Sequence, residues 1–405
     1  MTDRDTSVHH EWLAAQRREI VDFAVASRIP ESGFGWLDAA GKLSQREPIA
    51  TWITARMTHV FSLAHGFGDA DTAALADHGI TALRGPLHDD EHGGWYSGTA
   101  DTTKGAYEHA FVVLAAGSAA AMGRPGAEEL LAEALDTVEK RFWEDGAGLA
   151  RESWDRQWSA TEEYRGANSN MHLVEAFLAA GDATGDHTWH RRALGIAENL
   201  IHEVAAAHDW RLPEHFTPNW QPILDYNSDQ PQHRFRPHGS TVGHWLEWAR
   251  LLVQLEAVLG TEAPDWLLGD ARHLFESALD RGWNADGHPG FVYTLDWQDR
   301  PQVRARMHWV IAEAILTAAA LHHRTGEDHY LRWYGTFWDY ARTHHIDTDH
   351  GSWHHEVTPD GHPADSVWSG KPDAYHAYQA ALLPTLPLAP APAVLAAKRM
   401  RQAPR

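Results

Sequence analysis

The sequence contains no cysteine in its 405 residues. Disulfides, thiol nucleophiles, zinc–thiolate sites and iron–sulfur clusters are therefore excluded. Basic side chains are also scarce, because 34 Lys and Arg face 56 Asp and Glu, which gives a formal net charge of −22. A surface that binds phosphates needs clustered positive charge. The charge balance thus argues against nucleic acid and against anionic membrane surfaces as partners.

Long hydrophobic runs are missing as well. No stretch approaches the ~20 apolar residues that span a bilayer, and residues 1–19 lack the uninterrupted apolar core of a signal peptide. The sequence therefore predicts a cytoplasmic protein. Hydrophobic residues still make up 43% of the chain, which is enough for a large buried core.

Two residue types are abundant, with 20 Trp and 30 His. Tryptophan offers a flat apolar face that can pack against sugar C–H groups, and histidine can transfer protons near neutral pH. Most of these residues could equally fill the core or lie on a solvated surface. Function must therefore be argued from particular positions.

Ten segments carry apolar residues at steps of three and four, which indicates helices. They are residues 47–65, 104–122, 128–143, 169–180, 188–207, 242–259, 267–281, 304–323, 329–343 and 372–383. Pro48 is expected in the first turn of the first of these helices.

A turn motif recurs between the helices: an acidic or polar residue, one or two glycines, then an aromatic or apolar residue. It occurs at residues 31–36, 90–95, 144–149, 285–291 and 347–353, with a degenerate copy at 208–212. Intervals of roughly 55 to 80 residues leave room for two helices each.

Six helical hairpins in series predict an all-α fold, an (α/α)6 barrel formed by residues 1–385 as a single domain. The turns would lie at one end and form the mouth of the barrel. An open helical solenoid is the alternative. Residues 386–405 are rich in Pro and Ala and are expected to form a loose C-terminal surface tail.

Three histidines share one layout, because His172, His244 and His376 each follow small polar residues or a proline at the expected start of a helix. The partial positive charge of a helix N-terminus disfavours the imidazolium form, so we expect neutral imidazoles that can act as general bases. One such histidine alone would more simply be a capping or surface residue. Three in the same layout favour a functional site.

Each of these histidines also has polar neighbours on its own helix face. They are Asn168 and Glu175 for His172, Glu247 for His244, and Asp373 and Gln379 for His376. A carboxylate beside an imidazole can fix its tautomer and orientation.

Further polar residues stand where an inner helix should be apolar. Arg56 follows Trp52 by four residues, and Glu313 follows Trp309 by four. Arg236 precedes the helix of His244. A buried Arg or Glu is costly unless it is paired. Arg56 and Glu313 could therefore either belong to a site or form a structural ion pair between helices.

Four segments together resemble the N-acylglucosamine 2-epimerase superfamily, and within it the aldose–ketose isomerase branch that includes mannose isomerases. They are Thr-Trp-Ile-Thr-Ala-Arg at 51–56, Asn-Ser-Asn-Met-His-Leu-Val-Glu at 168–175, Gly-His-Trp-Leu-Glu-Trp at 243–248 and Gly-Lys-Pro-Asp-Ala-Tyr-His-Ala-Tyr-Gln at 370–379. The resemblance extends to about residue 385. The last segment favours an isomerase over the epimerases for N-acylglucosamine or cellobiose, whose last motif ends differently.

The resemblance implies an α/α barrel and an interconversion of mannose and fructose through a cis-enediol, with no metal and no cofactor. It implies that His244 and His376 are catalytic and that Arg56 binds the sugar. Our hypothesis for the mechanism adds that Arg56 stabilises the charge that develops on the enediolate oxygen. The substrate-binding residues that we expect are Trp52, Arg56, Asn168, His172, Arg236, Glu247, Trp309, Glu313, Asp373 and Gln379. Many members have a basic or aromatic residue before Trp309, whereas this chain has His308.

Three other functions stay open. A glycoside hydrolase or lyase would need two carboxylates, for which Asp89, Asp90 and Glu91 are candidates. A metal-dependent isomerase could use histidines, although the sequence has no His-Glu-x-x-His motif; its candidate ligands are His88, His92, His354 and His355. A non-catalytic sugar-binding or scaffolding protein is the third.

The expected partner is a small monosaccharide. Mannose, lyxose, glucose or a charged analogue such as a sulfonated sugar would all fit a site with several Arg and His. The sequence leaves the oligomeric state open.

Overall fold

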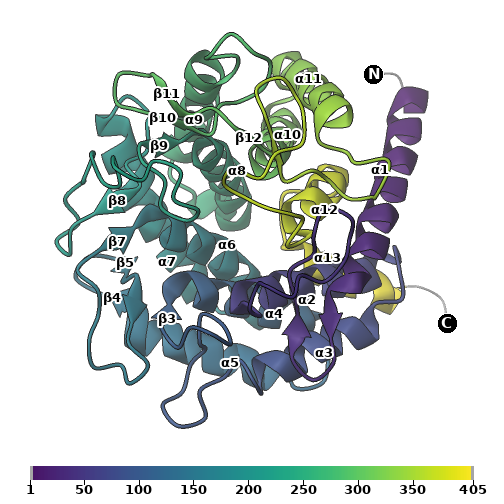
Figure 1. Ribbon diagram of the computed structural model, residues 1–405, viewed down its shortest axis with the longest axis vertical. Coiled ribbons are helices and arrows are strands. Elements are labelled where there is room, and N and C mark those ends of the chain that lie inside the picture. The colour runs from purple at the N-terminus through teal and green to yellow at the C-terminus, as the bar shows by residue number, and fades with distance from the viewer. Residues whose placement is uncertain (1–2, 403–405) are drawn as a thin grey trace.

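The computed structural model describes residues 3–402 and shows two concentric rings of helices. The inner ring consists of α2 (Thr51–Phe67), α4 (Ala106–Ala121), α6 (Ala167–Thr184), α8 (Val242–Leu259), α10 (His308–Thr325) and α12 (Tyr375–Leu382). The outer ring consists of α1 (Asp3–Ala24), α3 (Ala73–Leu83), α5 (Ala127–Thr137), α7 (Thr188–Ala197), α9 (Trp266–Gly282) and α11 (Asp328–His344). Figure 1 shows the inner helices around the centre of the molecule.

The inner ring is closed, because α12 contacts both α10 and α2. Five helix pairs are consecutive in the chain, and the sixth joins its two ends, since α1 packs on α12. The (α/α)6 barrel predicted from the sequence is thereby confirmed, and the open solenoid is wrong.

The ten expected helices are all present, and three more were missed: α1, α3 and α13 (Pro392–Gln402). Two segments lengthen their helices in wider π turns, at Val138–Phe142 after α5 and at Glu198–Ala205 after α7. The expectation for Pro48 was wrong. Ala50 is extended, with φ −98° and ψ 138°, so α2 begins only at Thr51.

The recurring turns lie where an outer helix ends and the chain returns to the inner ring. Two are hairpins, formed by β1 (Arg28–Ile29) with β2 (Gly33–Phe34) and by β4 (Trp143–Glu144) with β5 (Leu149–Ala150). Three more are closed by single bridges, His88 to Trp95, Trp283 to Phe291 and Ile346 to Trp353. The degenerate copy contains Asp209 and Trp210, both with positive φ.

Gly94 shows why one of these turns needs glycine. Its φ is +76°, and a Cβ atom there would lie 2.6 Å from the Trp158 side chain. An L side chain would be strained and would also clash.

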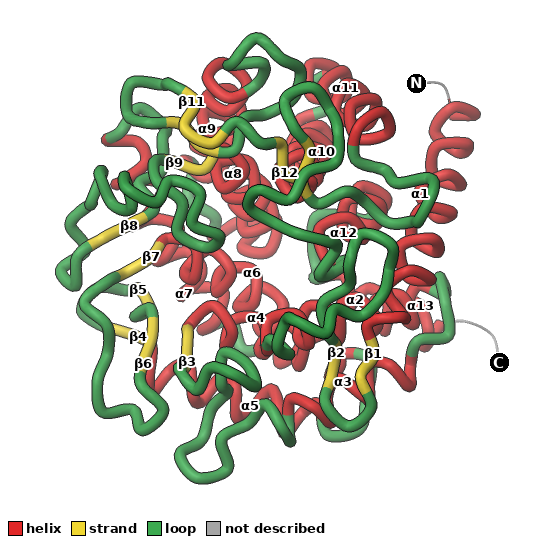
Figure 2. The backbone as a smooth tube through the Cα atoms, in the orientation of Figure 1, coloured by secondary structure: helices red, strands yellow, loops and turns green. Residues whose placement is uncertain are grey.

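Short strands tie the starts of the inner helices to the next repeat (Figure 2). β3 (Lys104–Gly105) pairs with β6 (Ser153–Trp154), β7 (Arg165–Gly166) with β8 (His215–Phe216), and β12 (Arg306–Met307) with β13 (Glu356–Val357). β10 (Thr294–Leu295) lies between β9 (Ser240–Thr241) and β11 (Pro301–Val303). Because β3, β7, β9 and β12 each lead directly into an inner helix, this pairing fixes where those helices begin.

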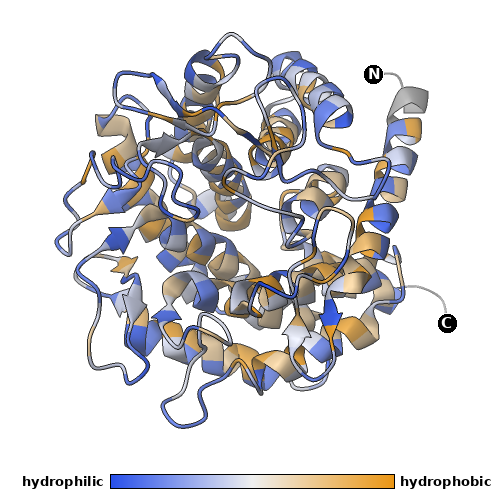
Figure 3. Ribbon diagram, in the orientation of Figure 1, coloured by the Kyte–Doolittle hydropathy of each residue, from blue (hydrophilic) through white to orange (hydrophobic). Residues whose placement is uncertain are grey.

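The inner helices are buried on nearly every side. In α4, the four consecutive residues from Phe111 to Leu114 are all buried, whereas the outer helix α11 buries one face only. Figure 3 shows that the apolar residues are concentrated in the helices, whereas the loops are mostly polar. In the part of the chain from residue 3 to residue 402, no helix has both the length and the apolar character that crossing a bilayer requires.

The C-terminal segment is not the loose tail expected from its composition. Helix α13 packs against α2 and α4, and Ala396 is fully buried. A Cβ atom on Gly66 would lie 2.7 Å from that of Ala396, so the small residues of the segment permit a close approach. The backbone N–H of Ala391 donates to Asp182 over 2.6 Å. Abundant alanine here reflects tight packing and not disorder.

Candidate active site

A cavity lies at the end of the barrel where the inner helices begin, and its empty space is about 600 Å³ when the open solvent at its mouth is included. Its wall includes Trp52, Arg56, Tyr107, Asn168, His172, Arg234, Phe235, Pro237, His244, Glu247, Tyr293, His308, Trp309, His355, Trp368, Pro372, Asp373 and His376. Nine of the twelve site residues expected from the sequence are in this wall. The mixed aromatic and polar lining suits a small polar ligand.

The three histidines reach the cavity from helix starts that differ in part from those expected. His244 is the third residue of α8, which begins where the sequence placed it. In contrast, α12 begins at Tyr375 and not at Pro372, and no side chain caps any of the three helices. Strand pairing, and not capping, sets the start of α6 and of α8.

His244 and His376 both lie beside Trp309. The ring centroid of Trp309 lies 5.1 Å from that of His244 and 5.8 Å from that of His376. Both imidazoles line the same cavity. One small molecule that rests near Trp309 could therefore contact both.

Each of these two imidazoles has a buried carboxylate partner. Nδ1 of His244 lies 2.9 Å from Oε2 of Glu214, and Nδ1 of His376 lies 2.9 Å from Oε1 of Glu313. A carboxylate only accepts hydrogen bonds, so Nδ1 carries the proton in both rings. Nε2 is then the basic atom, as it is in the histidine–carboxylate pairs of catalytic triads.

Burial lowers the pKa of His376, although the hydrogen bond and the charge of Glu313 act in the opposite direction. The pKa of His172 is held well below its usual value by burial and by the charge of Arg56. Both rings are therefore neutral near pH 7, as expected from the sequence. The main cause is desolvation, whereas the expected cause was the helix dipole.

Arg56 is a charged group fixed in the cavity wall. Its Nη1 donates to Asp373 over 3.2 Å and its Nη2 to the Tyr107 hydroxyl over 2.9 Å. The guanidinium also lies 4.3 Å from the Phe111 ring centroid and 4.8 Å from that of Tyr375. Burial would raise the pKa of Asp373, but the charge of Arg56 keeps it below its usual value. Both alternatives given for Arg56 therefore apply, because it forms an ion pair with Asp373 and both residues line the cavity.

An ion cluster centred on the buried Arg250 lies deeper in the barrel, between this cavity, which Glu247 lines, and a second cavity, which Arg250 and Glu175 line. Its Nε lies 2.8 Å from Glu313, its Nη2 3.5 Å from Glu247 and its Nη1 3.8 Å from Glu175. One guanidinium cannot compensate three carboxylates. Burial and the charge of Glu313 raise the pKa of Glu247 well above its usual value, whereas Arg250 outweighs burial and lowers that of Glu313.

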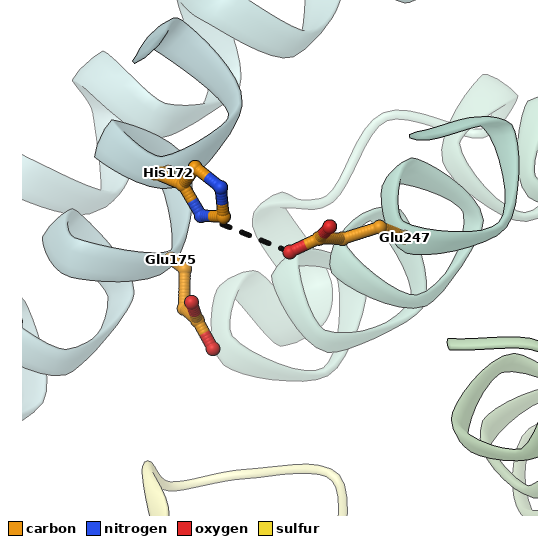
Figure 4. Close-up of side chains that lie close together, drawn as sticks. All are labelled: His172, Glu175 and Glu247. Carbon is orange, nitrogen blue, oxygen red and sulfur yellow. Dashed lines mark ion pairs between the residues drawn. The ribbon is translucent and has the colours of Figure 1, made fainter. Parts of the chain in front are cut away.

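Ligand atoms of His172, Glu175 and Glu247 lie within 4.8 Å of one another, a spacing that could hold a metal ion. Figure 4 shows His172 facing Glu247, with 3.8 Å between Nδ1 and Oε1, while Glu175 points away from this contact. Arg250 already supplies positive charge to both carboxylates, and the Tyr375 hydroxyl donates to Glu175. The positive charge of Arg250 beside these carboxylates disfavours a divalent cation at this place.

Three expected site residues lie outside the cavity wall. Arg236 donates to Glu162 over 2.8 and 3.1 Å and lines an outer vestibule beside the mouth. Glu313 is one layer deeper, behind His376. Gln379 donates to Glu175 and faces a second cavity at the opposite end of the barrel, which the segment 384–394 helps to close.

Several wall residues were missed because no sequence pattern marks them. Tyr107, Tyr293, Phe235 and Trp368 come from loops or helix starts. Glu214, the partner of His244, precedes β8 and was missed for the same reason. Arg250 could have been found, because it follows Glu247 by three residues and so shares its helix face.

The residues of the rival functions lie mostly elsewhere. Asp89 is fully buried against Lys104, at 3.0 Å, and accepts from Arg156, which makes it a structural carboxylate of its turn. His88 pairs with Asp90. Of the four candidate metal ligands among the histidines, only His355 lines the cavity.

Comparison with known proteins extends these findings. The model of the N-acylglucosamine 2-epimerase (GlcNAc 2-epimerase) family matches residues 33–380. The chain is 59% identical over 391 residues to a D-mannose isomerase of Thermobifida fusca, covering 95% of this chain and 96% of that one. It is 53% identical to a D-mannose isomerase of Pseudomonas cannabina pv. alisalensis, covering 94% of each. A crystal structure of a D-mannose isomerase superimposes with a TM-score of 0.86 at 28% identity, covering 93% of this chain and 97% of that one.

Together, the barrel, the histidine–carboxylate pairs and these matches define an enzyme of the sugar isomerase class. The chain belongs to the N-acylglucosamine 2-epimerase family.

Proposed function

We propose that this enzyme interconverts D-mannose and D-fructose through a cis-enediol intermediate, without a metal ion. The observation that carries the proposal is that His244 and His376 line one cavity and that each has a carboxylate on Nδ1. The two curated relatives, both D-mannose isomerases, support mannose as the substrate.

One histidine opens the pyranose ring by moving a proton from O1 to O5. The open-chain aldose then presents C2 to the other imidazole, whose Nε2 removes the C2 proton. The imidazolium so formed is stabilised by its carboxylate partner. The electrons of the C–H bond form the C1–C2 double bond, and O1 becomes an enediolate oxygen that Arg56 stabilises.

Collapse of the enediol completes the reaction. The proton held by the imidazole is delivered to C1, and the hydroxyl proton on O2 moves to O1, so that C2 becomes the ketone of fructose. Neither atoms nor electrons are gained or lost overall, so no cofactor is needed. Asn168, His172 and Glu247 lie in the same wall and are proposed to bind sugar hydroxyls.

The test is proton NMR of mannose incubated with the enzyme in deuterated water. The N–H proton of the imidazolium exchanges with the deuterated solvent before it is returned to the sugar. We therefore expect fructose that carries deuterium at C1, together with loss of the C2 proton signal of mannose. Glucose as the main product would favour a 2-epimerase instead, and unchanged mannose would refute the proposal. Activity lost with a chelator and restored by a divalent metal would refute metal independence.

Replacement of His244 or His376 by Ala should abolish turnover, and circular dichroism should report an intact fold. His88→Ala is the matched control, because His88 pairs with Asp90 in a turn outside the cavity wall, and this variant should keep wild-type turnover. Near-normal turnover in either histidine variant would refute its catalytic role.

A further inference from the structure

Two stacked histidines, His308 and His355, line the cavity but have no role in the proposed chemistry. His308 is the first residue of α10, and His355 directly precedes β13. Their ring centroids lie 3.6 Å apart with an interplanar angle of 21°. Both side chains line the cavity, yet the two residues are only 5% and 4% exposed.

The contacts of His308 fix its tautomer. Nδ1 lies 3.3 Å from the carbonyl oxygen of His355, which also accepts from the backbone N–H of His308 over 2.9 Å. Because a carbonyl only accepts, Nδ1 carries the hydrogen and Nε2 keeps a lone pair. Burial and the neighbouring imidazoles of His355 and His376 hold the pKa of His308 well below its usual value, so the ring carries no charge near pH 7.

Nε2 of His308 is a buried acceptor with no hydrogen-bond partner anywhere in residues 3–402. Buried polar atoms are almost always paired, and exceptions call for an explanation. The position of the ring supplies one. It lies 6.2 Å from the ring of His376, at nearly a right angle to it. A sugar that contacts His376 would bring its hydroxyls close to this acceptor.

We propose that Nε2 of His308 accepts a hydrogen bond from a substrate hydroxyl beyond the reacting carbons, on the side of His376, and that His308 thereby determines substrate specificity. His355 is the positioning residue, because its carbonyl sets the tautomer and its ring supports that of His308. This inference rests on the proposed function. A lone pair at this wall attracts a hydroxyl and repels a phosphate or sulfonate oxygen, so the sugar is unmodified there.

The test pairs variants with monodeoxy sugars. The kcat/KM of the wild type is measured for mannose and for its 3-, 4- and 6-deoxy analogues. For one analogue we expect a loss of about five- to a hundredfold, because it leaves the acceptor unpaired. In His308→Phe, which keeps an aromatic ring on His355, the same analogue and mannose should react equally well. His308→Asn, whose amide oxygen can accept, should restore part of the discrimination.

His59→Phe is the matched control. His59 is equally buried, but its Nδ1 lies 2.7 Å from the Ser118 hydroxyl and it lines the cavity at the other end of the barrel. We expect it to keep the deoxy selectivity of the wild type. A wild type that treats all analogues like mannose would overturn the inference, and so would a His308→Phe variant with unchanged selectivity.

Calorimetric affinities for the same four sugars separate this inference from the proposed function. If mannose binds but is not isomerised, the proposed function fails, while the affinities still show whether one hydroxyl contacts His308. If mannose is isomerised and the affinities and rates of His308→Phe keep the wild-type pattern, only the inference fails. No binding of any of the four sugars overturns both.

Discussion

Glu313 holds His376 and Arg250 with its two carboxylate oxygens, at 2.9 Å from Nδ1 of the imidazole and 2.8 Å from Nε of the guanidinium. One buried carboxylate thus joins a catalytic candidate to the ion cluster below it. The orientation of His376 therefore depends on a residue that lies outside the cavity wall.

Glu313→Gln should lower kcat about tenfold to a thousandfold, because the amide can stabilise neither the tautomer nor the imidazolium as well as a carboxylate. Steady-state kinetics with mannose measure the effect, and KM should change far less. Glu214→Gln is the matched variant for His244. A Glu313→Gln enzyme with wild-type kcat would show that the carboxylate has no role in catalysis.

The pH dependence of kcat/KM should reflect the depressed pKa of His376. Its burial places the acid limb below pH 6.5, so the enzyme should keep its activity on acidification to that pH and lose it only at lower pH. Because Glu313 raises this pKa, the limb should move to still lower pH in Glu313→Gln. An acid limb above pH 6.5 in the wild type would contradict the assignment of His376 as a base.

Arg250→Met should destabilise the fold by about 3–5 kcal/mol, because it leaves Glu175, Glu247 and Glu313 buried without their shared cation. Urea unfolding measures the loss. Arg250→Lys keeps the positive charge but lacks the several N–H donors of a guanidinium. Its free energy of unfolding should therefore lie between those of Arg250→Met and the wild type. Equal stability of Arg250→Met and wild type would show that these carboxylates are protonated in the folded state.

Lys371, in the Lys-Pro-Asp motif, stabilises a turn and does not contact the cavity. Its Nζ lies 2.6 Å from Asp347 and 2.6 Å from the carbonyl oxygen of Gly351. Burial alone would raise the pKa of Asp347, but the hydrogen bond from Lys371 lowers it to about 2.

A depressed carboxyl pKa stabilises the fold above the unfolded pKa of about 4, and this contribution is lost as the pH falls to about 2. Between these values the wild type should lose about 2 kcal/mol of stability through this group. Asp347→Asn should lack that part of the acid sensitivity and be less stable at pH 7. Parallel stability curves for the two proteins from pH 2 to pH 5 would contradict this account.

The sequence predicted what depends on local periodicity and missed what depends on partners elsewhere in the chain. The helix predicted for residues 242–259 has the same first and last residue as α8, because the apolar spacing begins and ends where the chain leaves the helix. Helix α13 was missed because its alanines gain stability only from a close approach to Gly66 and its neighbours. No local signal distinguishes such a segment from a flexible one.

The same division holds for the site. Motif positions such as Arg56 and Asp373 do line the cavity, although their sequence separation hides that they bind each other. Glu214 comes from a loop whose path depends on strand pairing between repeats, so it could not be found from spacing. The sequence did mark His355, but as a candidate metal ligand and not as a neighbour of His308. Arg236 stands between Phe235 and Pro237, which both line the cavity, but its own side chain donates to Glu162 and lies in the vestibule.

The barrel is closed by helices from opposite ends of the chain, since α1 packs on α12 and α12 contacts α2. During synthesis on a ribosome, the first five helix pairs can form before this closure, but their ring stays open until α12 has emerged. That last inner helix also carries His376. Unfinished chains therefore have neither the closed barrel nor one of the two proposed catalytic imidazoles. Isomerase activity is thus expected only once the fold is complete.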